Sequence, residues 1–459
     1  MYILEKLPMS IFKSFFTKKD NSGSTPLSNK KPNKSFNYEH LNSDQKIAKR
    51  KEIISSPNPI DVRELMALYS VEELCETAED YYKNIDDLSG LLRKPYNAIS
   101  ETSELLSIFS QIINGIKPIG GMDILDFGAG PGWASHALSS LGAKMIVSDA
   151  SASALKIVEE RYSKSPIPGS FVKPKFLHFD GRKLNLPTES IDRIVCIDAF
   201  HHIPNPDEII CEMFRVLKNG GIAAFAEPGP IHSWSPGGQY EMRKHQVVEN
   251  DVIIEDIWLM AKKAGFSDLK LALFNTSPFY VGMNEFNDFL QNGVTTQQYL
   301  QSSQHYMQSS LILFFLYKGT GEPIKDSRSS EGLSALIELN SDSVLNLRTN
   351  EKFTVKFRIT NSGSQKWLPA SQSFGSVWLG ADLQEKQSSL TKSGYFTFPL
   401  PIEETGGLLP NKTIEFECEI PTPETPGNYI YQFDLVSQQV AWFKNVGSLT
   451  KNIELIIKE

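Results

Sequence analysis

Ile124-Leu125-Asp126-Phe127-Gly128-Ala129-Gly130-Pro131-Gly132-Trp133 is the stretch that decides the fold of this 459-residue chain. Its apolar beginning predicts a buried strand, and its glycines predict a turn where the backbone approaches a ligand that a Cβ would strike. Trp133 follows Gly132, so the stretch has the pattern G-x-G-x-G and departs from the G-x-G-x-x-G of dinucleotide sites. We therefore expect a strand, a glycine-rich loop and a helix here.

Strand and helix patterns alternate after this stretch. Short apolar runs such as KMIVSDAS, FLHFDG, RIVCIDAF and GIAAFAEPG are separated by amphipathic segments such as SALKIVEERY and DEIICEMFRVLK. This alternation is typical of a mostly parallel sheet with helices on both faces. The predicted fold class is therefore α/β and Rossmann-like, with its ligand at the carboxyl ends of the strands.

Polar residues occupy the expected ends of these strands. Asp149 ends the second strand, where a carboxylate can accept hydrogen bonds from both hydroxyls of a ribose. Asp180-Gly181 ends the third strand, Asp198-Ala199-Phe200-His201-His202-Ile203-Pro204 ends the fourth, and Lys218-Asn219-Gly220-Gly221 precedes the fifth. Singly, such aspartates could cap helices and such glycines could form turns. The ordered set favours a ligand site.

In this order the segments resemble the motifs of class I S-adenosylmethionine-dependent methyltransferases, over about Gly120 to Gly229. The resemblance implies that S-adenosyl-L-methionine is the cofactor, that the glycines pass under its methionine part, that Asp149 binds the ribose and that Asp180 binds the adenine amino group. The residues assigned to the cofactor site in this way are Asp126, Phe127, Gly128, Ala129, Gly130, Gly132, Trp133, Asp149, Ala150, Asp180, Gly181, Asp198, Ala199 and Phe200.

Candidates for proton removal follow the fourth and fifth strands. An alcohol acceptor needs a base within hydrogen-bond reach as its bond to the methyl group forms, because its pKa is high. We expect His202 to be this base and His201 to pack or cap the next helix, although both could be structural. Glu227 is a second candidate. The spacing specifies no ligand set for a metal ion, so none is predicted.

The segment HSWSPGGQYEMRKHQVVEND at 232–251 is expected to be a loop. Tyr240, Arg243 and His245 could bind a polar acceptor there by stacking and hydrogen bonding. The alternative is an ordinary solvated loop. We carry these three residues as candidate acceptor ligands.

Composition divides the chain into four parts. Residues 1–57 form a flexible basic segment, and 1–60 hold eleven Lys and Arg against five Asp and Glu although the whole chain carries -8. Residues 58–115 have helical periodicity and form a preface or lid, in which Lys94-Pro95-Tyr96 could close over the cofactor. The methyltransferase domain is expected at 116–325. Evenly spaced short strands predict an antiparallel β-sandwich of about seven strands at 330–459.

Four motifs of this last part resemble immunoglobulin-like sandwiches found beside bacterial enzymes and transporters of surface-polysaccharide assembly. They are T-N-S-G-S-Q-K-W at 360–367, Val377-Trp378-Leu379-Gly380, Pro426-Gly427-Asn428-Tyr429 and Val440-Ala441-Trp442-Phe443. Trp367, Trp378 and Trp442 could stack on sugars or fill the core, and we expect at least one in the core. By association, the module favours a saccharide or lipid-linked saccharide acceptor in surface-polysaccharide biosynthesis.

Partners and compartment follow from charge and cysteine usage. The net charge of -8 does not favour binding to nucleic acid. The four cysteines lack the spacing of disulfide frameworks or metal sites, which favours a cytoplasmic protein. Residues 1–19 mix apolar and lysine positions, compatible with an interfacial helix at the inner face of a membrane or with a disordered start. The function alternatives are a methyltransferase of another small metabolite and a cofactor-binding scaffold without turnover.

Overall fold

The computed structural model of the chain describes residues 36–168, 173–276, 278–319, 326–372, 374–385, 394–404 and 407–459. The interfacial helix predicted at 1–19 lies outside the described residues. The described chain forms two compact units, one built from 36–116, 123–137 and 145–319 and the other from 117–122, 138–144 and the residues after 325. Within the described chain, no helix is long and apolar enough to cross a membrane.

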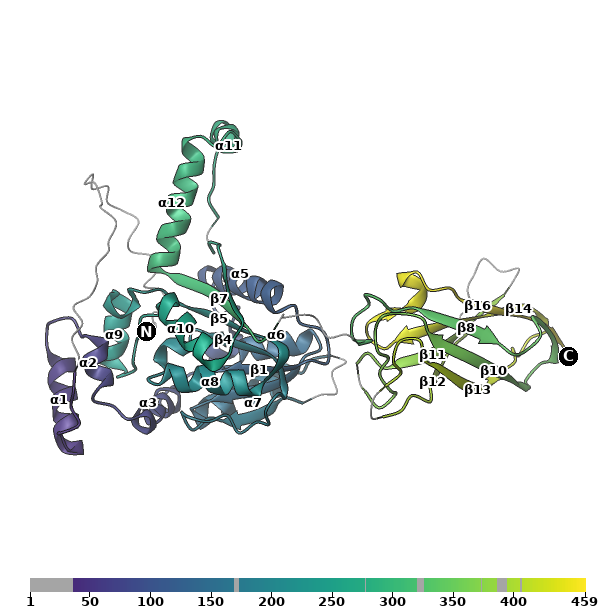
Figure 1. The fold of residues 1–459 in the computed structure, drawn as a ribbon, viewed down its shortest axis with the longest axis horizontal. Coiled ribbons are helices and arrows are strands. Elements are labelled where there is room, and N and C mark those ends of the chain that lie inside the picture. The colour runs from purple at the N-terminus through teal and green to yellow at the C-terminus, as the bar shows by residue number, and fades with distance from the viewer. Residues whose placement is uncertain are drawn as a thin grey trace, which may run out of the picture. The chain divides into compact units, whose positions relative to one another are not determined.

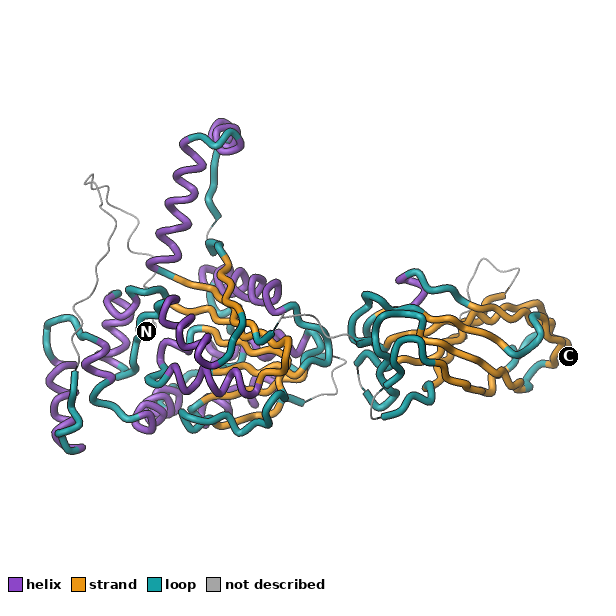
Figure 2. The backbone as a smooth tube through the Cα atoms, viewed as in Figure 1, coloured by secondary structure: helices purple, strands orange, loops and turns teal. Residues whose placement is uncertain are grey.

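A seven-stranded sheet forms the centre of the first unit, whose strands are orange in Figure 2. Its strand order is β3-β2-β1-β4-β5-β7-β6. The pairs β2 with β3, β1 with β4 and β4 with β5 are parallel, and β7 runs antiparallel between β5 and β6. The strands are β1 (Asp123–Phe127), β2 (Lys144–Asp149), β3 (Lys175–His178), β4 (Ile191–Ile197), β5 (Leu217–Pro228), β6 (Asp268–Ala272) and β7 (Leu311–Tyr317). The predicted mostly parallel α/β class is confirmed, and the strand order reverses between β1 and β4, where such sheets bind ligands.

Helices precede and connect these strands (Figure 1). The helix α1 (Ser43–Ser55) forms inside the segment 1–57 that the sequence predicted to be flexible, where Asn42 and Gln45 make a capping box at its start. The helices of the predicted preface are α2 (Val62–Met66), α3 (Val71–Lys83), α4 (Ser89–Arg93) and α5 (Ile99–Ile116). Those between or after the strands are α6 (Trp133–Ser140), α7 (Ala152–Lys164), α8 (Pro206–Val216), α9 (Pro236–Lys244) and α10 (Ile254–Ala264).

The segment 232–251 is not only a loop, as the sequence suggested, because it contains the 3-10 helix η3 (His232–Trp234) and α9. The side chain of Ser235 accepts a hydrogen bond from the Gly238 N–H, and Pro236 occupies the first helical position. A serine cap followed by proline is a common start of a helix, so this signal was present in the sequence.

The core of the first unit lies on the buried strands β4, β5 and β7 with α8 and α10 packed against them. Phe225 of β5 stacks on Phe314 of β7 with ring centroids 4.6 Å apart, and both side chains are fully buried. Burial of one such side chain contributes about 1.5–3 kcal/mol. This packing fixes the strand ends that carry the candidate site.

A helical hairpin between β6 and β7 stands away from the sheet (Figure 1) and was not predicted. It consists of α11 (Met283–Leu290) and α12 (Val294–Ser309), and we call residues 278–309 the arm. The Asp288 carboxylate accepts a 2.7 Å hydrogen bond from the Thr295 N–H at the start of α12. Phe279 and Phe289 pack edge-on against Tyr299, so the arm has a small core of its own.

The second unit is a sandwich of a three-stranded sheet, β13-β10-β8, and a larger sheet, β12-β11-β14-β16-β9, to which β15 pairs through β14. The strands are β8 (Ala335–Leu339), β9 (Val344–Arg348), β10 (Lys352–Asn361), β11 (Val377–Glu385), β12 (Gly394–Pro399), β13 (Thr413–Pro421), β14 (Gly427–Ser437), β15 (Ala441–Trp442) and β16 (Lys451–Lys458). The sandwich departs from the antiparallel prediction at one pair, because β9 and β16 are parallel.

The tryptophans of the sandwich divide between core and surface. Trp367 is fully buried and packs edge-on against Phe443 at 5.4 Å, so the expectation of a core tryptophan is confirmed. Trp378 and Trp442 are half-buried, and Trp442 lies edge-on to Tyr395 at 5.2 Å.

Candidate active site

The glycine-rich loop between β1 and α6 meets the end of β2. Gly130 has a φ of 51°, and its N–H donates a 2.8 Å hydrogen bond to Asp149 Oδ2. Asp149 Oδ1 accepts from the Ser151 N–H at 2.8 Å, and burial raises the pKa of this carboxyl. A Cβ at Gly130 would lie 2.6 Å from the hydroxyl of Tyr82. The loop, the Asp149 carboxylate and Tyr82 therefore converge.

Asp126, predicted to be a cofactor residue, is directed at helix α6. Its Oδ2 accepts hydrogen bonds from the Oγ of Ser135 at 2.5 Å and from the Ser135 N–H at 3.1 Å. Burial raises the pKa of Asp126 to about 6. The contact fixes the start of α6 relative to β1.

Three aromatic residues predicted for the cofactor site are buried in edge-to-face pairs. The pairs are Phe127 with Phe179 at 5.1 Å, Trp133 with Phe109 at 5.7 Å and Phe200 with Phe225 at 5.2 Å. Their side chains support the loop and strand ends. These three residues would therefore contact a cofactor through their backbone atoms.

Asp180 is exposed after β3 and shapes the turn that follows. Its Oδ1 accepts from the N–H groups of Lys183 at 2.8 Å and Arg182 at 2.9 Å, and these bonds lower the pKa of its carboxyl. Gly181 has a φ of 85° in the same turn. The adenine role of Asp180 stays a prediction.

Helix α3 contributes residues that the sequence did not reveal. Glu79 accepts hydrogen bonds from Ser151 Oγ at 2.8 Å, Ser153 N at 2.9 Å and Ser153 Oγ at 2.6 Å. Burial opposes the ionisation of Glu79, but these donors outweigh it and lower its pKa to about 2. Burial and the charge of Asp149 raise the pKa of Tyr82 well above 10.0. Helix α3 is thus fastened beside Asp149 with its tyrosine over the glycine loop.

Arg161 of α7 joins the lid segment to the same loop. Its Nε donates to Pro131 O at 2.7 Å, and its terminal nitrogens donate to Leu91 O at 2.5 Å, Lys94 O at 2.9 Å and Leu92 O at 3.1 Å. Burial lowers the pKa of Arg161 to about 10, which leaves it charged. The segment around Lys94 is therefore held next to the glycine loop.

The segment after β4 also abuts the loop. A Cβ at Gly128 would lie 2.5 Å from the Cβ of Ala199, so only glycine allows this approach. Asp198, the residue before Ala199, is exposed and has a φ of 54°. The 3-10 helix η2 (Phe200–His202) follows and carries both candidate histidines.

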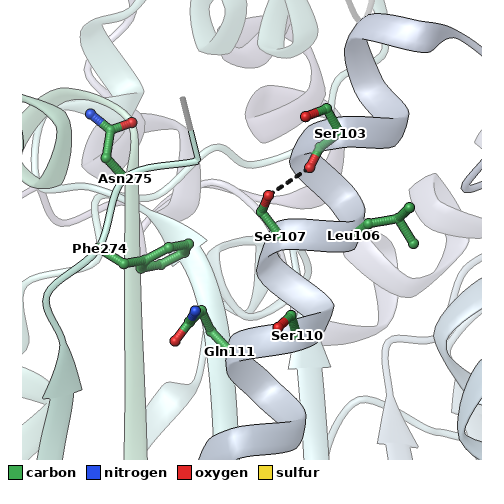
Figure 3. A pocket seen from close by; sticks show the side chains of 7 residues that line it. All are labelled: Ser103, Leu106, Ser107, Ser110, Gln111, Phe274 and Asn275. Atoms are coloured by element: carbon green, nitrogen blue, oxygen red, sulfur yellow. Dashed lines mark hydrogen bonds between the residues drawn. The ribbon is translucent and has the colours of Figure 1, made fainter. Parts of the chain in front are cut away.

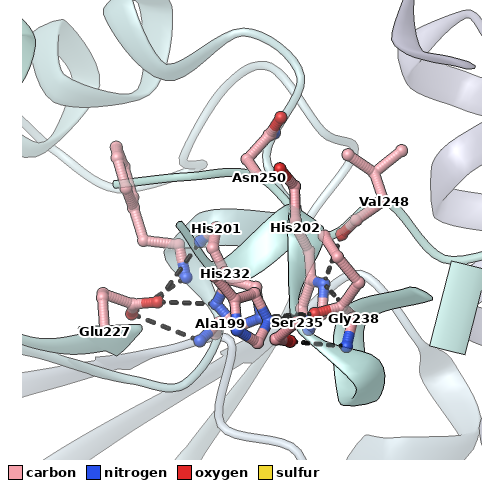
Figure 4. A network of polar contacts seen from close by, with 12 residues as sticks. Ala199, His201, His202, Glu227, His232, Ser235, Gly238, Val248 and Asn250 are labelled. Carbon is pink, nitrogen blue, oxygen red and sulfur yellow. Dashed lines mark hydrogen bonds and ion pairs between the residues drawn. The ribbon is translucent and has the colours of Figure 1, made fainter. Parts of the chain in front are cut away.

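Glu227 at the end of β5 is fully buried beneath η2 (Figure 4). Its carboxylate accepts hydrogen bonds from the N–H groups of Phe200 at 3.0 Å, Ala199 at 3.2 Å and His201 at 3.3 Å. It also pairs with His201 Nδ1 at 2.8 Å. Its oxygens are occupied by donors of the chain itself.

His201 lies between two buried carboxylates. Its Nδ1 faces Glu227 and its Nε2 lies 3.4 Å from Glu249 Oε2, which also pairs with His232 Nε2 at 2.5 Å. Burial alone would lower the pKa of His201, but hydrogen bonds to Glu227 and Glu249 raise it well above 6.5. Burial opposes ionisation of Glu249, but the surrounding histidines hold its pKa below the usual range. His201 is therefore an imidazolium with both nitrogens engaged.

His202 differs from its neighbour because one nitrogen stays available. Its Nδ1 is 2.7 Å from the backbone oxygen of Val248, which can only accept, so Nδ1 carries the proton and neutral His202 has its lone pair on Nε2. Its side chain is 39% exposed. Burial and the charge of His201 lower its pKa below 6.5, which keeps it neutral near pH 7.

The same cluster has the composition of a cation site. One ligand atom from each of His201, His202 and Glu249 lies within 4.8 Å of the other two. These groups already pair with one another, with Glu227 and with Val248. Each of the three candidate ligands therefore already has a partner within the chain.

The three candidate acceptor ligands lie on or next to α9. The guanidinium of Arg243 donates to the backbone oxygens of Asn58, Ser56 and Ile54 at 2.7, 3.1 and 3.2 Å, which gives it a structural role at the end of α1. The hydroxyl of Tyr240 accepts from Lys244 Nζ at 2.7 Å, and His245 lies edge-on to Tyr81 at 5.3 Å. Acceptor binding by Tyr240 and His245 stays a prediction.

Residues 125–225 match a family model described as a methyltransferase domain, and residues 342–446 match one described as an Ig-like domain from next to BRCA1 gene. The prediction of a methyltransferase domain is confirmed for the first segment. The second match agrees with an immunoglobulin-like sandwich.

Curated relatives cover the same region. Demethylmenaquinone methyltransferase of Clavibacter sepedonicus is 27% identical over 158 residues, which are 32% of this chain and 62% of the relative. Ubiquinone biosynthesis O-methyltransferase, mitochondrial, of Rattus norvegicus is 31% identical over 105 residues, 23% and 30% of the two chains. The chain thus spans less than two thirds of these relatives. A solved S-adenosylmethionine dependent methyltransferase from Mesorhizobium loti aligns with a TM-score of 0.34 at 17% identity, over 46% of this chain and 97% of that one.

Proposed function

We propose that this protein is an S-adenosylmethionine-dependent methyltransferase that deprotonates a hydroxyl acceptor through His202. The observation that carries the proposal is the fixed orientation of His202 in η2, the 3-10 helix that follows Ala199 at the glycine loop. Its Nδ1 proton is committed to Val248 O at 2.7 Å, so the Nε2 lone pair is the one free to accept a proton.

The residues around the loop fit the cofactor. Gly128 and Gly130 let Ala199 and Tyr82 approach the loop closely, because a Cβ at either glycine would strike them. Both oxygens of Asp149 keep lone pairs for ribose hydroxyls after accepting one backbone N–H each. S-adenosylmethionine would supply a methyl group on a sulfonium. The glycine loop would bind the methionine part of the cofactor, and Asp149 would bind its ribose. Tyr82 would exclude water from above the loop.

The other two candidate bases act through His202. Glu227 accepts five hydrogen bonds, one of them from Cys196 Sγ at 3.5 Å, and His201 has both nitrogens engaged, so neither has a lone pair free for an acceptor. Glu227 instead holds His201 charged, and that charge keeps His202 neutral. We assign His201 and Glu227 as positioning residues. A base that is neutral at the working pH is what deprotonation of an alcohol requires.

The acceptor is proposed to be a saccharide or lipid-linked saccharide of surface-polysaccharide biosynthesis. The support is the sandwich resemblance and the half-exposed Trp378 and Trp442, since aromatic rings offer stacking area to sugars. A second candidate is a hydroxylated ring of the quinone-precursor class, which the printed names of two relatives favour. We place the protein in the cytoplasm, with peripheral membrane contact through residues 1–19 as a further proposal.

Transfer of labelled methyl groups to fractionated cell extract tests the proposal, with polysaccharide, lipid-linked, isoprenoid and small-metabolite fractions compared. In His202→Asn the side-chain amide can still donate to Val248 O, but Nε2 is lost. We expect labelling to fall about 10²–10⁴-fold while affinity for S-adenosylmethionine stays unchanged. His305→Asn, an exposed histidine of α12, is the matched control.

Three outcomes count against parts of the proposal. Unchanged labelling in His202→Asn removes His202 as the base. Label confined to small metabolites or to isoprenoid material overturns the saccharide acceptor. Cofactor binding without label in any fraction favours the non-catalytic scaffold.

A further inference from the structure

The outer face of the larger sheet of the sandwich carries a group of aromatic and polar side chains. Along β11 the side chains of Val377, Leu379 and Ala381 enter the core, so the residues that alternate with them point outward. Their cross-strand neighbours on β12 and β14 point to the same side, and β15 pairs with β14 there. We call this group the aromatic face, and its members are Trp378, Asp382, Tyr395, Thr397, Gln432 and Trp442.

Trp442 is held in a fixed position on this face. Gly380 of β11 lies against its six-membered ring, because a Cβ at this glycine would lie 2.5 Å from Cζ3 and Cη2 of the indole. The next residue, Phe443, is fully buried in the core, and the N–H of Lys444 donates a 3.1 Å hydrogen bond to the buried carboxylate of Asp434. A ring that is already ordered loses little conformational entropy when a ligand stacks on it.

Tyr395 completes a pair of rings with Trp442. The two ring centroids lie 5.2 Å apart with an angle of 69° between the planes, and Tyr395 is 49% exposed. Within the described chain, the hydroxyls of Tyr395 and Thr397 and the Nε1–H of Trp442 make no hydrogen bond. Asp382 lies directly opposite Tyr395, and one of its oxygens accepts from Gln384 at 3.1 Å. The rings are therefore bordered by polar groups that can still donate or accept hydrogen bonds.

The outer face of the three-stranded sheet has a different composition. Lys352 and Lys356 of β10 lie opposite Glu419 and Glu417 of β13, and their charged groups are 3.5 and 3.6 Å apart. Exposed charge pairs of this kind are usual on a solvated surface and contribute little to stability. The pairing of rings with polar groups is thus particular to the aromatic face.

The chemistry of the aromatic face indicates its ligand. A sugar ring has C–H groups that pack on an aromatic ring and hydroxyls around its edge that both donate and accept hydrogen bonds. The carboxylate of Asp382 and the side chains of Thr397 and Gln432 offer matching acceptors and donors. Asp382 and Lys444 flank the rings with opposite charges, so the face does not select a strongly charged ligand.

We propose that the aromatic face binds an uncharged saccharide chain, with a sugar ring stacked on the pair formed by Tyr395 and Trp442. The hydroxyls of the sugar are bonded by the polar side chains of the face, Asp382, Thr397 and Gln432. A longer chain continues toward Trp378, which lies two positions before Gly380 on the same strand. Binding requires neither S-adenosylmethionine nor methyl transfer. That the bound saccharide is also the methyl acceptor rests on the proposed function.

Binding of saccharide probes by the full chain without S-adenosylmethionine tests this proposal. The probes are the polysaccharide fraction of cell extract in affinity electrophoresis, and maltohexaose, cellohexaose, mannohexaose and chitohexaose in calorimetry. We expect retardation by the fraction and a Kd of about 10 µM to 1 mM for at least one hexasaccharide. Trp442→Ala and Tyr395→Ala should each weaken binding about 10–100-fold, because each removes a stacking ring. Tyr395 is half-exposed on the edge strand β12, so its variant is expected to fold.

Two control variants locate the binding site. Lys356→Ala changes the outer face of the opposite sheet and should leave binding unchanged. Gln111→Ala changes a groove of about 500 Å³ beside α5 in the first unit, whose uncharged lining includes Ser107, Phe274 and Asn275 (Figure 3). A groove of this composition could also hold a sugar, so unchanged binding in Gln111→Ala is the result that our proposal requires.

Three results overturn the proposal. They are the absence of binding to the fraction and to every hexasaccharide, wild-type affinity in folded Trp442→Ala and Tyr395→Ala, and weakening by Gln111→Ala alone. Binding of a decaproline peptide in place of saccharides would also overturn it and would assign the face to a protein partner. Saccharide binding by a chain that methylates no fraction supports this proposal and counts against the proposed function, whereas glycan labelling without saccharide binding has the opposite meaning.

Discussion

Replacing Glu227 by glutamine removes the negative charge beneath the two histidines without changing the size of the side chain. The amide can keep one acceptor oxygen for the Phe200 and Ala199 N–H groups. Its NH₂ group would face the His201 N–H and the protonated Nδ1, which are both donors. The perturbation therefore creates a clash between donors at a fully buried position.

The expected cost follows from these contacts. A hydrogen bond to a charged group contributes about 1.5–3 kcal/mol, and a buried donor left without an acceptor costs about 1–3 kcal/mol. Breaking a buried charge pair by removing one partner typically costs 3–5 kcal/mol. We expect Glu227→Gln to lower the free energy of unfolding of the first unit by about 3–5 kcal/mol, a large share of the 5–15 kcal/mol typical of a domain.

The cost should depend on pH in a defined direction. The pKa of His201 is raised above 6.5 in the folded protein. Its pairing with Glu227 therefore makes its full contribution to stability below pH 6.5, and this contribution is lost as pH rises through the folded pKa. The difference between wild type and Glu227→Gln should therefore be larger at pH 6 than at strongly alkaline pH. Glu249 has the opposite pH dependence, because its pKa is lowered in the folded protein. Its ionised carboxylate stabilises the fold above pH 4.5, and this contribution is lost as pH falls through the folded pKa.

Urea unfolding followed by far-UV circular dichroism at several pH values measures this cost. Asp126→Asn is the matched control, since Asp126 is also a buried carboxylate, and Ser135 is its partner among the described residues. Burial raises the pKa of Asp126 to about 6, so its charge destabilises the fold near neutral pH, and its replacement should cost no more than about 1 kcal/mol. A Glu227→Gln cost below that of Asp126→Asn, or one that grows with rising pH, would refute the assignment of His201 as a charged, doubly bonded histidine.

Two further predictions concern the cofactor and the sandwich. Asp149→Ala should weaken binding of S-adenosylmethionine and its demethylated product by about 10–100-fold in calorimetry, since one charge-assisted acceptor is lost; equal affinity would show that the ribose binds elsewhere. A chain ending near residue 330 should still bind S-adenosylmethionine, because the predicted cofactor residues lie between Asp126 and Phe200. It should methylate long or carrier-linked glycans poorly, because the sandwich that would recruit them is absent. Equal labelling by the full and the shortened chain would show that the sandwich does not recruit the acceptor.

The sequence predicted the sheet because each strand is a short apolar run that ends in a polar residue. Asp149 and the glycine loop were found in this way, and the structure brings them within 2.8 Å. The same logic selected the segment after β4, and Ala199 of this segment lies against Gly128 of the loop. A local sequence pattern is sufficient to predict a site residue when that residue stands directly at the end of a predicted strand.

Residues whose partners are distant in sequence could not be found in this way. Glu79 contacts Ser151 and Ser153, which lie 72 and 74 positions later, and Glu249 meets His201 only after the chain turns back along α9. A lone glutamate on an amphipathic helix is usually a solvated residue. The arm was missed for a related reason, because its helices bury little and the longer one, α12, has weak apolar periodicity.

Arg161 constrains how a cofactor could enter and leave the protein. Its guanidinium is bonded to three carbonyls at the end of α4 and to Pro131 of the glycine loop. Opening the lid between α4 and the loop would leave a buried charge without acceptors, at a cost of several kcal/mol. Slow exchange would follow if the opening occurred there. Rapid exchange requires that the loop and α4 move together as one rigid gate, with the hinge in the segments that flank α4.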